Sequence, residues 1–364
     1  MRVVQRVLIA GGYGVVGSDV ARILRRLYPS LELILAGRSP ENGDALAREL
    51  GFCSVAKLDF EAEGPLLADG LSPDLIIMAV HDHTDRLLTY ALEHDIGYVD
   101  FARGGDAQTR GLHVVGQFPG PVHRGIGFVS NWMAGVPAVL AKRAAETMAT
   151  VEAIDLSILF YGEDRGGPDA AGSVEGFTAT FKGWEKGAWQ DMKPFTDPLK
   201  VTFPSGLTRT TYRLNMPDVE SLAFATRAQS VRVRLGLDNA LMGWASTFMV
   251  RSGLWHLFSK KTQEGMLYNP GDGAPHEIVV HVTGKDAHGH EMQQTLSLAD
   301  PQGQTHLTAL GAAHMAERIL GLDGAPAARG GVIYAEALGN PERLEELLAL
   351  EGVHFVDRAN SPLG

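Results

Sequence analysis

The sequence has 364 residues, of which 45% are hydrophobic and 21% are charged, a composition typical of a globular protein large enough for two domains. Its 43 acidic and 32 basic residues give a net charge of -11, and no lysine- or arginine-rich run occurs, which argues against a nucleic-acid partner. The single cysteine, Cys53, can form neither an intrachain disulfide nor a thiolate zinc site, so a cytoplasmic location is predicted. The most apolar stretch, residues 241–258, is interrupted by Arg251, so no membrane span is expected.

The first 130 residues alternate short apolar strands with amphipathic helices. Strands are predicted at 3–10, 31–36, 54–58, 75–80 and 98–101, and helices at 15–28 and 87–94. The continuous apolar run at 75–80 is typical of a strand that is covered on both faces. This alternation predicts an α/β fold with a Rossmann-type, doubly wound parallel sheet.

The pattern changes after Asn131, where longer strand-like segments and Gly/Pro-rich loops begin. Residues 277–298 are predicted to form a hairpin that turns through 285–290, and a helix is predicted at 307–320. These features predict a second, α+β domain with a mostly antiparallel sheet, which would bind substrate.

A spaced-glycine motif follows the first predicted strand. Gly12, Gly14 and Gly17 stand between that strand and the next helix, the position in which they form a dinucleotide-binding turn. Gly12 would permit the tight turn, Gly14 would let pyrophosphate approach the backbone, and Gly17 would let the helix pack closely on the strand. The free N–H groups and the positive end of the helix dipole would face the diphosphate.

The second strand ends without the acidic residue that binds the ribose hydroxyls of NAD. Arg38 and Ser39 stand there instead, and a guanidinium beside a hydroxyl suits a 2′-phosphate, so NADP is the predicted cofactor. Alternatively, Arg38 stacks on adenine or faces solvent. Asp59 is predicted either to reach the adenine edge or to cap a following helix. The residues assigned to cofactor binding are Gly11, Gly12, Tyr13, Gly14, Val15, Val16, Gly17, Arg38, Ser39, Asp59, Ala79, Val80 and His81.

These residues and three later segments resemble the saccharopine dehydrogenase-like reductases. The segments are Tyr98-Val99-Asp100, the hinge-like Gly125-Ile126-Gly127-Phe128-Val129 and, near the C-terminus, residues 331–338 with the helix and strand that follow. The resemblance implies a dinucleotide-binding domain at 1–130 that is completed by 326–364, and a substrate and oligomerisation domain at 131–325. It also implies an NADP-dependent dehydrogenase or reductase.

Three positions depart from that family's pattern. His81-Asp82-His83 stands where a Pro-Phe pair is common, Phe101-Ala102-Arg103 where Gly-Glu is common, and Ser130-Asn131-Trp132 where Pro-Gly is usual. All three lie where substrate and nicotinamide are expected, so the family's standard substrates are not carried over to this chain.

Candidate catalytic residues cluster at the predicted carboxyl ends of the strands. His81 or His83 is predicted as the proton donor, because an imidazole titrates near neutral pH. The alternative is that His81 bonds cofactor or backbone and that His83 caps the helix entering at Asp85. Asp100 and Arg103 follow the next strand, where Arg103 either clamps a substrate carboxylate or forms a salt bridge to Asp100 or Asp106. No metal site is predicted there.

In the second domain, Tyr161 and Arg165 begin a glycine-rich loop, with Gly162, Gly166, Gly167 and Gly172, that is predicted to close over substrate. Trp184 and Trp189 are interpreted as an apolar wall of the site or as core. The pair His288 and His290 is assigned to a solvated hairpin turn rather than to a metal site. Residues 236–258 are predicted to form a packed helix, with a lipophilic pocket or a homodimer interface as alternatives.

Three functions follow from this pattern. The first is NADP(H)-dependent hydride transfer to or from a C=N or C=O bond of a small molecule. The second is a C=C reductase on the same scaffold, and the third is a protein that binds NADP without turnover. The fold alone does not separate them.

Overall fold

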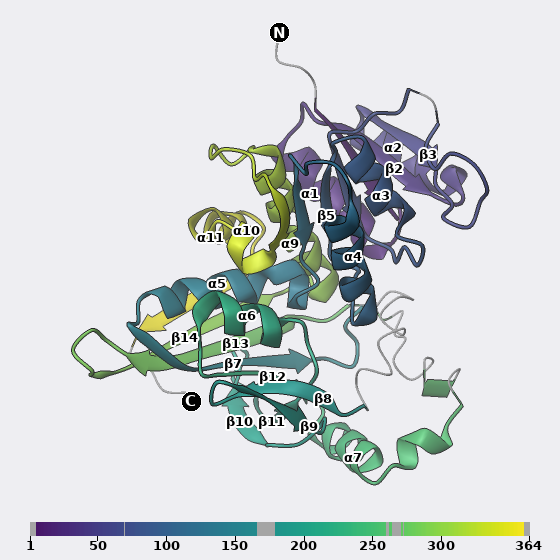
Figure 1. Cartoon of the computed structure of the whole chain (residues 1–364). Helices are drawn as coiled ribbons and strands as arrows, with labels where there is room; N and C mark the ends of the chain where they lie inside the picture. The colour runs from purple at the N-terminus through teal and green to yellow at the C-terminus, as the bar shows by residue number, and fades with distance from the viewer. Residues whose placement is uncertain are drawn as a thin grey trace. The chain divides into compact units, whose positions relative to one another are not determined.

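The computed structural model describes residues 5–68, 70–165, 179–259, 262–263, 271 and 273–359 (Figure 1). Within it the chain divides into two compact units. The first unit comprises Met1–Ser130 and Thr308–Arg343, and the second comprises Asn131–Leu307 and Leu344–Gly364.

The first unit contains a parallel sheet in the order β15-β6-β5-β4-β1-β2-β3. From β1 the chain winds outward to β3 in one direction and from β4 toward β6 in the other, so the direction of winding reverses between β1 and β4. Ligands of such sheets bind beyond the carboxyl ends of the strands at this reversal. The strands are β1(Arg6–Ala10), β2(Glu32–Gly37), β3(Cys53–Lys57), β4(Leu75–Met78), β5(Gly97–Asp100), β6(Gly125–Phe128) and β15(Gly331–Tyr334).

Helices cover the strands of this unit, and their apolar faces explain why they form. In α1, Val20, Ile23 and Leu24 are buried at helical spacing, whereas the four residues of β4 are all buried, as expected of a central strand. The helices are α1(Val15–Leu27), η1(Pro40–Gly43), α2(Asp44–Leu50), α3(Arg86–Glu93), α4(Asp106–Gln117) and α10(Ala335–Leu338); α9(Gln304–Leu320) and α11(Pro341–Leu350) span unit boundaries. The predicted doubly wound parallel sheet is confirmed.

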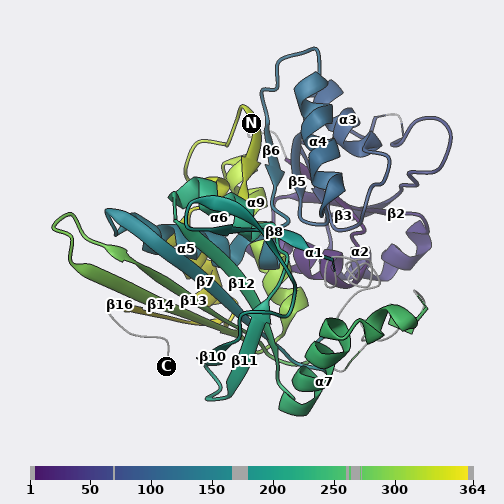
Figure 2. The same cartoon turned by 60° about the horizontal axis from the view of Figure 1, so that its bottom comes forward.

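The second unit is a mixed sheet in the order β10-β11-β12-β7-β13-β14-β16, in which only the described β12–β7 pairing is parallel. Helices α5 and α6 lie against one face of it (Figure 2). The predicted mostly antiparallel sheet is therefore confirmed. The strands are β7(Thr150–Phe160), β8(Phe181–Glu185), β9(Ala188–Met192), β10(Leu199–Thr202), β11(Thr208–Arg213), β12(Ser230–Leu237), β13(His276–Lys285), β14(Glu291–Asp300) and β16(His354–Ala359); the helices are η2(Trp132–Gly135), α5(Val136–Glu146), α6(Asp218–Thr226), α7(Ala240–Arg251) and η4(Leu254–Leu257).

Two elements differ from the sequence prediction. The helix expected at 236–258 starts at Ala240, because the Asn239 side chain accepts the N–H groups of Leu241 and Met242, and it ends at Arg251. A short 3-10 helix, η4, follows Gly253. The C-terminal strand β16 pairs with β14 of the second sheet, whereas β15 pairs with β6 of the first. The compact units divide after residues 130, 307 and 343, whereas the sequence places the domain boundaries after residues 130 and 325.

Candidate functional site

The loop between β1 and α1 packs so closely that side chains do not fit at its glycines. Gly11 adopts a φ of 76° and donates its N–H to the Ala36 carbonyl of β2 at 2.7 Å. A Cβ on Gly12 would lie 2.8 Å from the Ile9 carbonyl, and a Cβ on Gly17 would overlap the Gly11 carbonyl oxygen. The turn and the approach of α1 to β1 therefore both require glycine.

Helix α1 starts at this loop without a side-chain cap. Gly14 is its N-cap, no side chain accepts a hydrogen bond from the first turn, and no acidic residue stands there. Val15 and Val16, the first residues of the helix, carry no polar group. Because the first N–H groups of a helix have no intrahelical partner, this end offers donors to an anionic ligand.

Tyr13 joins the glycine loop to the end of β2. Its ring packs so closely on Gly37 and Gly43 that a Cβ at Gly43 would lie 2.8 Å from the ring. Its hydroxyl accepts the N–H of Ser39 at 3.0 Å. Next to Ser39, Arg38 is exposed, and no ion pair or hydrogen bond of its guanidinium occurs among the described residues. An unpaired positive charge is thus carried at the tip of β2.

Asp59 follows β3 at the edge of the sheet. Its carboxylate accepts the N–H of Glu61 at 3.1 Å, so it caps a turn. The predicted alternative, a cap on a following helix, is wrong, because the next helix in the described residues is α3 at Arg86.

The end of β4 adjoins the glycine loop. Ala79 donates its N–H to the Ala10 carbonyl at 3.0 Å, and the Val80 side chain lies against Gly11, where a Cβ would approach it to 2.5 Å. The predicted cofactor residues of β1 and β4 are therefore neighbours. His81, which follows, is half-buried.

Asp82, rather than His83, orders the start of α3. One carboxylate oxygen of Asp82 accepts the Thr84 N–H and the other accepts the Leu87 N–H, both at 2.9 Å. His83 is exposed, with its ring 6.0 Å from that of His81 and nearly parallel to it. The expectation that His83 caps this helix is wrong. The N–H groups of Thr84 and Leu87 donate to the Asp82 carboxylate instead.

Arg103 is a buried structural hub. Its Nε donates to Asp100 at 2.9 Å, and its Nη1 donates to Asp85 at 2.5 Å and to the Ala107 carbonyl at 2.8 Å. Its guanidinium also lies over the Phe128 ring. Only 3% of the residue is exposed, so the predicted clamp on a substrate carboxylate is wrong and the salt-bridge alternative is found, with Asp85 in place of Asp106.

These charges shift the pKa values of their neighbours. Burial lowers the pKa of Arg103. The negative charges of Asp100 and Asp85 raise it by more than burial lowers it, so the pKa lies above its ordinary value. Burial raises the pKa of Asp100 against the opposing pull of Arg103. Tyr98, which is fully buried and bonded to Asp100 at 3.2 Å, has its pKa raised by burial. Through these bonds Arg103 connects Asp100, at the end of β5, to Asp85 in the segment that follows β4.

A shallow depression brings together His81, Asp100 and Arg103, three of the four predicted catalytic residues of the first unit, whereas His83 is not part of its lining. It is lined by His81, Asp82, Asp100, Ala102, Arg103 and Ala107. The carboxylates and the arginine are bonded to one another or to backbone, whereas the His81 ring has no hydrogen-bond partner among the described residues. The role of Asp85 was missed from the sequence; an Asp at the entry to a helix is ambiguous, because it is equally common as a plain cap.

Tyr161 belongs to the second unit. Its hydroxyl donates to Glu277 at 2.5 Å, and the buried Glu277 also accepts the Ser205 N–H at 2.8 Å. Burial, followed by the Glu277 carboxylate, raises the pKa of Tyr161. This phenol is therefore held by a carboxylate that opposes loss of its proton.

The predicted closing loop is described only in part. Arg165 is exposed and donates to the Gly271 carbonyl at 3.1 Å, and Gly162 donates its N–H to Asp238 at 3.1 Å. Gly166, Gly167 and Gly172 lie outside the described residues. Trp184 and Trp189 pack edge to face at 5.1 Å beside Phe224, and Trp189 is 40% exposed. They form a surface aromatic cluster rather than core.

Comparison with solved structures identifies the architecture. Saccharopine dehydrogenase (L-Glu forming) from Saccharomyces cerevisiae matches 98% of this chain over 100% of its own, with 13% identity and a TM-score of 0.67. The chain has a saccharopine dehydrogenase-like fold. At this identity the match speaks for the fold and not for the activity. No protein-family model and no curated protein sequence matches the chain.

Two other matches are weaker. Myo-inositol dehydrogenase from Corynebacterium glutamicum has 13% identity, 99% and 100% coverage of the two chains and a TM-score of 0.43. Scyllo-inositol dehydrogenase from Lactobacillus casei, with bound NAD(H) and scyllo-inositol, has 11% identity, 97% and 99% coverage and a TM-score of 0.45. These scores are too low to support an inference. Among the described helices, none has the length and apolarity required to cross a membrane.

Proposed function

We propose that this chain is an NADP(H)-dependent oxidoreductase that transfers a hydride to or from a C=N or C=O bond of a small molecule. The fold shared with saccharopine dehydrogenase supports the oxidoreductase class. The glycine loop supports a dinucleotide, because Gly12 and Gly17 allow the tight turn and the close approach of α1, and because no side chain caps the N-terminus of α1. When bound, the nicotinamide would supply or accept the hydride.

Arg38 carries the proposal of NADP rather than NAD. The strand tip that would present an acid to the ribose hydroxyls presents a guanidinium, which is exposed and without a described partner. A planar guanidinium binds phosphate through two parallel N–H bonds. Tyr13 and Ser39 fix the backbone beside it through the 3.0 Å hydrogen bond. These residues would hold the 2′-phosphate.

His81 is the proposed proton donor or acceptor. It stands in the depression beside the carboxyl ends of β4 and β5, where Asp82, Asp100 and Arg103 are committed to structural bonds. A half-buried imidazole can give a proton to the nitrogen or oxygen on which charge develops as hydride arrives. Asp100 and Arg103 are proposed to position this edge of the sheet.

A titration of cofactors into the protein tests the proposal. Calorimetry would compare NADPH and NADH for the unmodified chain, Arg38→Asp and the control Arg48→Asp, an exposed arginine on α2. Loss of a charge-assisted contact of roughly 1–3 kcal/mol predicts that Arg38→Asp weakens NADPH binding about 5- to 150-fold and NADH binding much less. Arg48→Asp should change neither affinity. Equal losses for both cofactors would contradict the NADP assignment.

A substrate panel then separates the chemistry. NADPH oxidation would be followed with cyclic and acyclic imines, ketones, aldehydes and conjugated enoyl compounds. Turnover of imines or carbonyl compounds supports the proposal. Turnover of enoyl compounds alone would assign the chain to C=C reduction, and tight NADPH binding without any turnover would support a non-catalytic role.

A further inference from the structure

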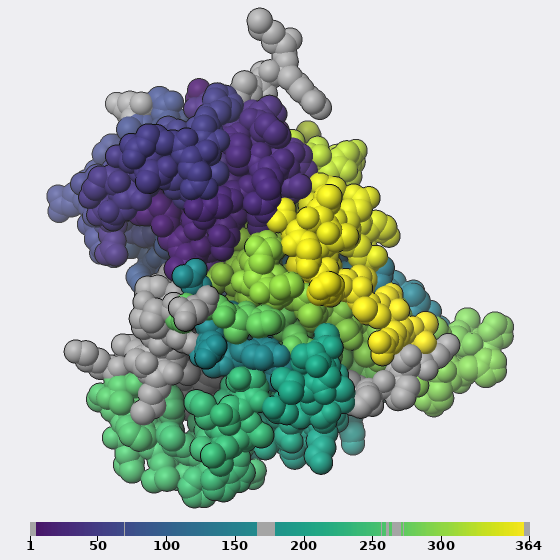
Figure 3. All heavy atoms as spheres, turned by 180° about the vertical axis from the view of Figure 1, so that it is seen from behind, coloured from purple at the N-terminus to yellow at the C-terminus, as the bar shows by residue number. Residues whose placement is uncertain are grey.

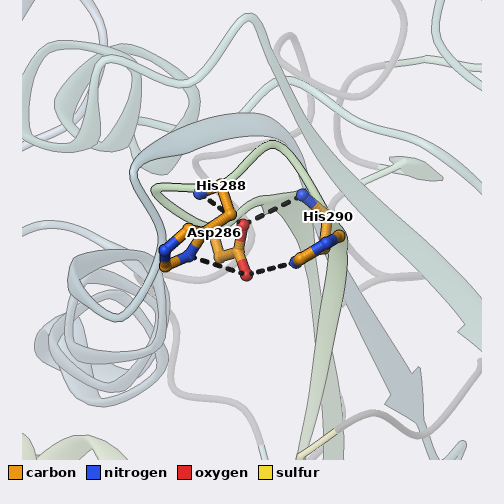
Figure 4. Close-up of side chains that lie close together, drawn as sticks. All are labelled: Asp286, His288 and His290. Carbon is orange, nitrogen blue, oxygen red and sulfur yellow. Dashed lines mark hydrogen bonds and ion pairs between the residues drawn. The ribbon is translucent and has the colours of Figure 1, made fainter.

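The tip of the β13–β14 hairpin gathers three metal-ligating side chains. Asp286, His288 and His290 occupy the turn between the two strands, and each offers one ligand atom within 4.8 Å of the others. The imidazoles are 80% and 79% exposed, and the hairpin projects at the surface of the second unit (Figure 3). Both histidine rings face the carboxylate from its two sides (Figure 4).

The two oxygens of Asp286 have separate tasks. Oδ1 accepts the backbone N–H groups of His288 at 2.7 Å and His290 at 2.9 Å, which fixes the carboxylate in the turn. Oδ2 lies 3.0 Å from His290 Nδ1 and 3.9 Å from His288 Nδ1. Gly289, with a φ of 84°, allows the turn that brings the two imidazoles to the same carboxylate. Backbone hydrogen bonds therefore hold the carboxylate, and the 3.0 Å hydrogen bond between His290 Nδ1 and Oδ2 holds one imidazole beside it.

The two separations from Oδ2 lie near those that a small transition-metal ion needs, and the ligand atoms of the two imidazoles lie within 4.8 Å of each other. Zinc bonds to imidazole nitrogen and carboxylate oxygen are about 2.0–2.2 Å long, so neighbouring ligands of a tetrahedral ion stand roughly 3.3 Å apart. One of the separations from Oδ2 is slightly shorter than this and the other slightly longer. Exposed side chains can make a shift of this size by small rotations, because no packing holds them.

We propose that Asp286, His288 and His290 form a zinc-binding site of two imidazoles, one carboxylate and water. Imidazole nitrogen favours zinc, copper and nickel over magnesium and calcium, which prefer oxygen ligands. Three protein ligands leave the remaining position open to water or to a group from another molecule. The site lies on the second unit, and no residue proposed to bind cofactor takes part in it.

Zinc calorimetry on tag-free, chelator-treated protein tests the site, since a polyhistidine tag would itself bind the ion. The unmodified chain should bind one ZnCl₂ equivalent that His288→Ala and His290→Ala each weaken at least about 10-fold. Asp286→Asn should also weaken it, while its side-chain oxygen can still accept the backbone bonds of the turn. The controls are His354→Ala, an exposed histidine on β16, and His81→Ala.

The thermal melt in zinc supplies a second readout. An ion that binds the folded hairpin raises the melting temperature by mass action, and the shift should disappear in His288→Ala and His290→Ala. Undiminished zinc binding in both variants would overturn the proposal, as would a loss of binding in His81→Ala alone. Absence of zinc binding to the unmodified chain below millimolar concentration would overturn it too. None of these outcomes depends on NADPH binding, so the test is independent of the proposed function.

Discussion

Arg103 and His81 lie in the same depression but differ in burial and in hydrogen bonding. Arg103 is enclosed by two carboxylates, a carbonyl and an aromatic ring, so removing one of its partners would leave a buried charge at a cost of roughly 3–5 kcal/mol. His81 is half-buried, and its ring forms no ion pair or hydrogen bond among the described residues. At the scale of single residues, the structural role of Arg103 and the proton transfer proposed for His81 thus belong to adjacent strand ends.

This division predicts the behaviour of His81→Ala. Turnover of the panel substrate should fall roughly 10²- to 10⁴-fold, the usual contribution of a positioned general acid or base, while the NADPH dissociation constant changes less than about twofold. Steady-state kinetics and calorimetry would measure the two quantities. His113→Ala, an exposed histidine on α4, is the matched control. Unchanged turnover in His81→Ala would remove this histidine from the mechanism.

At the scale of elements, Gly17 of α1 and Gly116 of α4 have contrasting surroundings. A Cβ at Gly17 would overlap the Gly11 carbonyl, whereas a Cβ at Gly116, near the end of α4, would meet nothing within 4 Å. The first glycine allows a strand and a helix to pack together. The second only adds conformational freedom to the unfolded chain.

Substitution by alanine should therefore change the stability in opposite directions. Gly17→Ala should lower the melting temperature and weaken NADPH binding, because α1 must move away from β1. Gly116→Ala should raise the free energy of unfolding by roughly 0.5–1 kcal/mol, as expected for a helical glycine in open space. Chemical denaturation of both variants would measure this. A stabilised Gly17→Ala protein would contradict the packing described for the glycine loop.

At the scale of the whole molecule, the C-terminal segment serves both units. Strand β15 extends the first sheet, and β16 completes the second by pairing with β14 from Ala299 to Gln294. The guanidinium of Arg143, on α5, also lies over the ring of Phe355 on β16. The last strand is thus part of the second sheet and not of the first.

Truncation after Gly352 tests this assignment. Removing β16 exposes the edge of β14, so the melting temperature should fall and the protein should become more prone to aggregate. NADPH affinity in the remaining folded fraction should change less than about twofold. Differential scanning fluorimetry and calorimetry would separate the two effects. Loss of NADPH binding at an unchanged melting temperature would place β16 with the nucleotide site instead.

The sequence alone determined the first sheet, the glycine turn and the unusual strand tip at Arg38. Each depends on local chemistry: burial of apolar runs, the space that glycine leaves, and the residue that ends a strand. The predicted hairpin through 285–290 is confirmed for the same reason, since its pattern and turn are local. The assignment of residues to cofactor and catalysis stays a prediction.

Only the tertiary structure decided which partner each charged or edge group takes. Arg103 bonds to Asp85, which lies 18 residues earlier. Asp82, rather than His83, accepts the Leu87 N–H at the start of α3. The pairing of β16 with β14 joins segments about 60 residues apart. Sequence patterns record burial and turn geometry, but ion pairs and edge strands are selected by what the fold brings near, so these choices could not be predicted from the sequence.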